Sequence, residues 1–177
     1  GWELLEAVCT GRRSSLRSET GGSAVEMALV LPVLALILAG ILDFGLVFSD
    51  LMALKQGVGA GVRQGVVGQT GSVSSCSING AAGATTDTKK LMCLTKDHVG
   101  LDDAETRTMV SFPDSKLKGG SLIICAQTPL ESASTFFDPI LNGALKARVH
   151  MRIEQDLSTF GTSSETALAG SDWSWCV

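Results

Sequence analysis

The most concentrated apolar stretch of the chain lies near its N-terminus and predicts a membrane-spanning helix. Residues 27–48 read MALVLPVLALILAGILDFGLVF, with Asp43 as the single charged residue. At 1.5 Å per residue this stretch forms a helix of about 33 Å, close to the ~30 Å hydrocarbon thickness of a bilayer. A buried core helix is the alternative, but a domain of this size rarely encloses such a helix on all sides.

Two stripes extend the helical pattern to about residue 67. Apolar residues recur at steps of three and four: Leu51, Leu54, Val58, Val62 and Val66. A second stripe, at steps of four, consists of Gly57, Gly61 and Gly65. Each glycine lowers helix stability by about 1 kcal/mol relative to alanine, so this stripe predicts a close packing contact. The contact is either with another subunit or with the chain's own sheet.

The remainder of the chain predicts a small α+β domain. Residues 68–86 are rich in Gly, Ser and Thr, and residues 87–98 suit a short helix capped by Thr86 or Asp87. Strands are expected at 106–112, 121–127 and 145–154, with a short amphipathic connection at 134–142. In the last strand every odd position is apolar and every even one polar. We expect an antiparallel sheet of about three strands that packs on the outer half of the long helix.

Composition narrows the function classes. The chain is 45% hydrophobic and 18% charged, with a net charge of −4, which argues against a disordered protein and against nucleic-acid binding. No C-x-x-C or H-x-x-x-H spacing predicts a metal site, and His98 and His150 are far apart in the sequence. No G-x-S-x-G element is present either. We therefore expect no enzyme activity, no cofactor, no metal and no small-molecule substrate.

Basic residues and cysteines predict the topology across the membrane. Three arginines precede the apolar run, at positions 12, 13 and 17, and basic residues are sparser after it, which favours a cytoplasmic N-terminus. Cys9 lies in the leader, and the other four cysteines lie beyond the span: Cys76, Cys93, Cys125 and Cys176. An even number outside suits disulfides in an oxidising exterior. Three pairings are possible. We favour Cys76–Cys93 and Cys125–Cys176, the second of which would hold the C-terminal tail on the sheet.

The start of the apolar run carries a more specific signal. Residues 17–27, RSETGGSAVEM, place small residues and the lone carboxylate of Glu26 where hydrocarbon begins. This resembles the cleavage region of type IV prepilins, in which a peptidase cuts after a glycine and leaves a glutamate as the fifth mature residue. A cut between Gly21 and Gly22 makes Glu26 that fifth residue. A neighbouring subunit's N-terminal ammonium could then pair with it and set axial register. The alternative is a glutamate that interacts with its own helix dipole.

Successive motifs along the helix resemble those of TadE-like proteins. These motifs are AVEMALVLP at 24–32, ILDFG at 41–45 and QGVGAGVRQG at 56–65. TadE-like proteins are minor pilin-like components of the tight-adherence (Tad) pilus system. In this resemblance Asp43 and Gly45 are the family's Asp-Phe-Gly residues, and Pro32 marks a kink or a point where the helix can loosen. The implied partners are a prepilin peptidase, other major and minor pilins, the inner-membrane assembly platform and the lipid bilayer.

These expectations define three segments. Residues 1–21 form a cytoplasmic leader, 22–67 a long helix that spans the inner membrane once, and 68–177 a disulfide-linked head outside it. The expected function is assembly of an adhesive Tad pilus or its secretion machinery, with a place in the surface pilus left open. An uncleaved membrane-anchored binding or adhesion module is the main alternative, and a secreted enzyme cut near Gly40 is a third.

Overall fold

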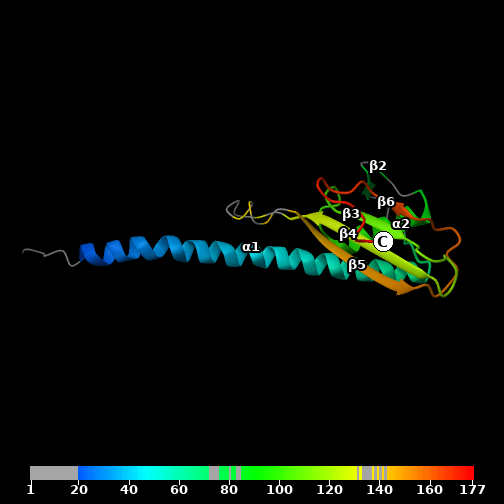
Figure 1. Ribbon diagram of the computed structural model, residues 1–177, viewed down its shortest axis with the longest axis horizontal. Coiled ribbons are helices and arrows are strands. Elements are labelled where there is room, and N and C mark those ends of the chain that lie inside the picture. Colours follow the sequence, from blue (N-terminus) through cyan, green and yellow to red (C-terminus); the bar gives the residue numbers. More distant parts are fainter. Residues whose placement is uncertain are drawn as a thin grey trace, which may run out of the picture. The chain divides into compact units, whose positions relative to one another are not determined.

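The computed structural model describes residues 20–71, 76–79, 81–82, 85–130, 132, 137, 139, 141 and 143–177 (Figure 1). The chain divides into two compact units, residues 1–39 and 40–177. The described part of the first unit is the beginning of helix α1, which runs from Thr20 to Val66. It continues through Pro32, and from Gly22 onward it is long and apolar enough to cross a membrane.

The second unit contains a four-stranded antiparallel sheet. Its strands are β3 (Arg107–Ser111), β4 (Ser121–Pro129), β5 (Ala144–Arg152) and β6 (Ser163–Ser164), in the order β5-β4-β3-β6. The three longer strands match those expected from the sequence, and along β5 exposed side chains alternate with buried or half-buried ones from Leu145 onward. The expectation of about three strands missed β6, because a two-residue strand leaves no alternation. The same holds for the separate β1–β2 pair (Ser77–Ile78 with Ala81–Ala82).

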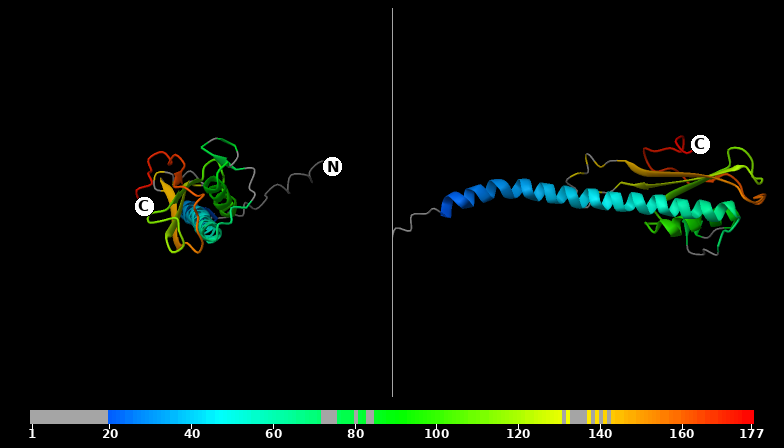
Figure 2. Two further views of the ribbon diagram at one scale, coloured as in Figure 1. Left: turned by 90° about the vertical axis from the view of Figure 1, so that its right-hand side faces the viewer. Right: turned by 90° about the horizontal axis from the view of Figure 1, so that it is seen from below.

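The core of the second unit lies between the sheet and two helices. The second half of α1 and helix α2 (Asp87–Val99) lie on the same side of the sheet (Figure 2). The apolar stripe on α1 is buried as predicted at Leu54, Val58, Val62 and Val66, while Leu51 is half-buried. The four buried residues belong to one cluster with Leu122 and Ile124 of β4 and with residues of α2. The head is therefore built directly on the continuation of the apolar helix.

Helix α2 begins and ends with regular caps. The Thr86 side chain accepts a hydrogen bond from the Lys89 backbone N–H, as one of the two expected caps. Gly100 closes the helix in the left-handed conformation, at φ 67°.

Hydrogen bonding from Thr159 and then from Lys90 lowers the pKa of Asp87. Because the pKa is lowered on folding, ionised Asp87 contributes stability at neutral pH that is lost as pH falls through the folded-state pKa.

The C-terminal tail packs on the other face of the sheet, over β3 and β4. Met109, Ile123, Cys125 and Cys176 form a second buried cluster, against which Trp173 and Trp175 pack. Disulfides join Cys125 to Cys176 and Cys76 to Cys93, which is the pairing favoured from the sequence. Trp173 Nε1 donates to the Glu165 carbonyl at 2.8 Å. The tail is thus held by a covalent bond, by ring packing and by hydrogen bonds.

Candidate membrane and assembly segment

The expected cleavage residues lie in the first turn of α1. Gly21 and Gly22 follow Thr20, where the helix begins, and Glu26 lies one turn after Gly22 on the same face. Glu26 is exposed between the exposed apolar side chains of Val25 and Met27. The expected cytoplasmic features, Cys9 and the three arginines, lie outside the described residues. A cut after Gly21 would leave Gly22 as the first residue of a helix with a carboxylate about 6 Å further along its axis.

Apolar side chains on all sides of this part of the helix are open to solvent. Each is between 48% and 71% exposed: Val25, Met27, Leu29, Val30, Leu31, Val33, Leu34, Leu36, Ile37 and Leu38. A monomer in water rarely exposes a contiguous apolar surface of this extent. The segment therefore requires lipid tails or other apolar helices around it, and it is compatible with single-pass membrane anchoring.

The Asp-Phe-Gly motif separates into two environments. Asp43 is buried, at 1% exposure, and its Oδ2 accepts a hydrogen bond from Ser132 Oγ at 3.3 Å. The ring of Phe44 lies 6.2 Å from that of Phe137, measured between centroids. Gly45 is exposed, with open space where a Cβ would lie. The carboxylate thus faces Ser132, which follows β4 in its own chain. Phe136 and Ile140, two apolar residues of the amphipathic connection expected at 134–142, lie outside the described residues.

The glycine stripe packs against α2. A Cβ added at Gly57 would lie 2.5 Å from the Val99 Cα, and one at Gly61 would overlap the Thr95 hydroxyl. At Gly65 the added atom would lie 2.9 Å from a methyl group of Leu91. The contacts step in opposite directions along the two helices, so the helices are antiparallel.

The sequence led us to expect a contact with another subunit or with the chain's own sheet, and did not include α2. The nearest atoms at Gly57 and Gly61 belong to α2, and at Gly65 Leu122 of the sheet lies 2.8 Å from the added atom. The four-residue period identified the face of the helix, but not the element that packs on it.

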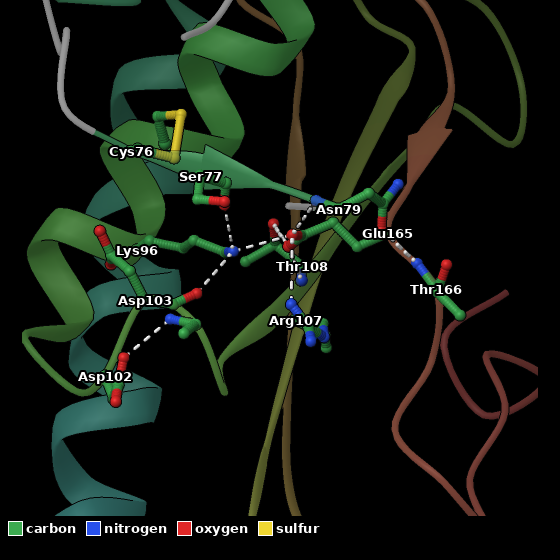
Figure 3. Close-up of polar contacts among 12 residues, drawn as sticks. Cys76, Ser77, Asn79, Lys96, Asp102, Asp103, Arg107, Thr108, Glu165 and Thr166 are labelled. Carbon is green, nitrogen blue, oxygen red and sulfur yellow. Dashed lines mark hydrogen bonds and ion pairs between the residues drawn. A yellow bond between two sulfur atoms is a disulfide. The ribbon is translucent and has the colours of Figure 1, made fainter. Parts of the chain in front are cut away.

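Sequence reasoning missed a buried ionic network (Figure 3). Lys96 Nζ donates to Glu165 Oε1 at 2.8 Å and to the carbonyls of Ser77 and Asp103 at 3.0 and 3.1 Å. Glu165 Oε2 accepts from the Thr108 backbone N–H at 2.8 Å and from its hydroxyl at 3.0 Å. Both charged side chains are fully buried. The three donors of the Lys96 ammonium therefore have three acceptors, which indicates a role in stabilising the fold.

The described residues contain no group of three or more His, Cys, Asp or Glu side chains that could hold a metal ion. His150 is exposed on β5, and His98 Nε2 lies 3.1 Å from Gln64 Nε2, in a hydrogen bond that joins α2 to α1. An open pocket is bordered by Lys118, Gly119 and residues 152–154. Its lining contains a lysine, an arginine and a glutamate, but no nucleophile paired with a base.

Comparison with protein families identifies the N-terminal segment. Residues 21–63 match the TadE-like protein family. The TadE-like segment begins at the candidate cleavage site and includes Glu26, Asp43 and the first two glycines of the stripe. No curated protein and no solved structure matches the chain. The resemblance expected from the motifs is confirmed for this segment.

Proposed function

We propose that this chain is a minor pilin-like, TadE-type component that a prepilin peptidase processes and that acts in assembly of a Tad adhesive pilus or its secretion machinery. One observation carries the proposal. The TadE-like match begins at Gly21, in the first turn of a helix whose apolar side chains are exposed up to Leu38, and that helix continues into a folded head. A pilin subunit needs this combination, because its helix must stay in the membrane before assembly and pack among other helices afterwards.

The proposed location is the inner membrane, with a cytoplasmic leader and an external head. The arginines of the leader favour this orientation. The two disulfides support it as well, since disulfides persist in oxidising compartments outside the cytoplasm. An uncleaved membrane-anchored binding module is compatible with the same orientation, so processing is the feature that separates the two functions.

Glu26 is the proposed assembly residue. Its carboxylate is exposed among apolar side chains, an unfavourable position in lipid unless a positive group pairs with it. After cleavage, the N-terminal ammonium of a neighbouring pilin could supply that charge. One such pair per subunit would fix how far neighbouring helices are displaced along the axis.

The test is the mature N-terminus, measured by mass spectrometry on membranes from cells with and without a prepilin peptidase. We expect a peptidase-dependent start at Gly22. An intact leader in both strains would support the uncleaved anchor, and a start near Gly40 would support secretion. In the same cells, Glu26→Ala should be cleaved normally but fail to enter or support pili, whereas Glu154→Ala on the exposed head surface should behave as wild type. Normal piliation of the Glu26 variant would contradict the register role.

A further inference from the structure

Two residues between β4 and β5, Ser132 and Phe137, contact α1 inside the stretch that the sequence assigned to the membrane. The Ser132 hydroxyl donates a hydrogen bond to the Asp43 carboxylate, and the Phe137 ring packs on that of Phe44. The same ring lies 3.5 Å from the position that a Cβ would occupy on Gly40. We call these five residues the collar: Gly40, Asp43, Phe44, Ser132 and Phe137.

Bilayer hydrocarbon cannot accommodate the collar. Irregular backbone facing lipid does not occur in the hydrocarbon region, because its polar groups would find no hydrogen-bond partners. Ser132 and Phe137 lie outside any helix or strand. The Asp43 carboxylate is also costly to place among lipid tails, and here the protein encloses it at 1% exposure with a hydroxyl as donor. The helix must therefore leave the hydrocarbon before the collar.

We infer that α1 leaves the bilayer at the collar, so that the embedded segment is Gly22–Ala39 and not residues 27–48. This inference rests only on the membrane anchoring in the proposed function. At 1.5 Å per residue, Gly22–Ala39 forms a helix of about 27 Å, which suits a hydrocarbon core of about 30 Å. Its large apolar side chains from Val25 to Leu38 are all exposed, as lipid contact requires. The division of the chain into two units falls at the same place, between Ala39 and Gly40.

In this arrangement Asp43 lies at the membrane surface and not within the hydrocarbon. Its carboxylate holds Ser132 against the helix at the membrane surface, and this fixes how closely the head approaches the lipid headgroups. Exposed Leu42 lies at headgroup level on the side of the helix away from this contact. The same residue would lie about 9 Å inside the hydrocarbon if the span ended at residue 48.

Cysteine labelling distinguishes the two boundaries. The series is Leu34→Cys, Leu38→Cys, Leu42→Cys, Leu46→Cys and Ser49→Cys, all at exposed positions that leave the collar intact. Each is made in a full chain carrying Cys9→Ser and is reconstituted in vesicles of phosphatidylcholine and phosphatidylglycerol. A charged, membrane-impermeant maleimide is added outside, and rates are normalised to Leu117→Cys, which is exposed on the head.

We expect positions 42, 46 and 49 to label at rates similar to Leu117→Cys. Positions 34 and 38 should label at least about tenfold more slowly, because hydrocarbon excludes the charged reagent. The inference would be overturned if the labelling rate rose only between positions 46 and 49, with position 42 labelling as slowly as position 34. The result does not depend on pili, so a failed Tad role and a failed boundary are distinguishable.

A cross-link tests the collar itself. The pair Asp43→Cys with Ser132→Cys replaces two side chains in hydrogen-bond contact, and the control pair Ile41→Cys with Ser132→Cys uses a residue that is 64% exposed on the helix. In vesicles under mild oxidation, the first pair should form a disulfide and the control should not. Equal yields from the two pairs, or a cross-link confined to detergent-solubilised protein, would overturn the collar as a membrane-surface structure.

Discussion

At the scale of single residues, the Lys96–Glu165 pair is the most consequential contact of the head. It connects α2 to a segment 69 residues later in the chain and also engages β3 through Thr108. Two charges that leave water lose their hydration, and the pair is stable only because every donor and acceptor is matched. Removal of one partner therefore leaves the other charged, buried and without its counter-ion.

We predict that Lys96→Met lowers the free energy of unfolding by about 3 to 5 kcal/mol. The double variant Lys96→Met with Glu165→Leu should recover much of this loss, since no buried charge remains. Urea unfolding of the full chain in detergent micelles, followed by tryptophan fluorescence, measures both. The control is Lys90→Met, whose ion pair with Asp87 is about one-third exposed and should contribute little to stability. Equal effects of the two lysine substitutions would contradict the structural role of the network.

At the scale of elements, the head depends on how closely α1 and α2 approach each other. Gly57, Gly61 and Gly65 remove the side chains that would separate the helices, and Val99, Thr95 and Leu91 occupy the space. The Cys76–Cys93 disulfide ties α2 to the segment before β1. The low helix propensity of glycine is thus offset by helix packing within the subunit.

A pair of glycine substitutions tests this packing. Gly61→Ala should destabilise the head by about 1 to 3 kcal/mol, because its methyl group overlaps the Thr95 hydroxyl. Gly59→Ala is the matched control: it has open space around its Cβ position and should gain up to about 1 kcal/mol from helix propensity. Thermal unfolding followed by circular dichroism compares them. If Gly61→Ala is as stable as Gly59→Ala, the close helix contact is wrong.

Local sequence patterns predicted the helices and the longer strands well, but they did not predict the contacts between distant parts of the chain. The alternation of β5 and the Thr86 cap of α2 are properties of a few neighbouring residues, so they could be read from the sequence. The burial of Lys96 depends on the return of the C-terminal segment, which no local pattern encodes. The segment with a functional motif was identified correctly as TadE-like, but the enclosure of Asp43 by Ser132 required the fold.

At the scale of the whole molecule, the chain joins two parts with opposite solvent requirements. The helix up to Ala39 exposes apolar side chains, whereas the head buries its own core between the sheet and the helices. The TadE-like match covers the first part and the beginning of the second, ending at residue 63 before the sheet. The family signal thus lies in the segment that membrane insertion and helix packing constrain, and the head is defined by its own contacts.

The cysteines give a prediction for the whole chain, because the number of free thiols should change when the leader is removed. Of the five cysteines, four are paired in the head, and Cys9 lies in the proposed leader. Denatured without reductant, the unprocessed chain should take up one alkylating group, at Cys9, and the chain that starts at Gly22 none. After reduction the numbers should be five and four. Intact-mass measurement on protein from membranes with and without peptidase gives these numbers directly. Additional free thiols in the processed chain would show that its head had not reached an oxidising compartment, because both disulfides join parts of the folded head.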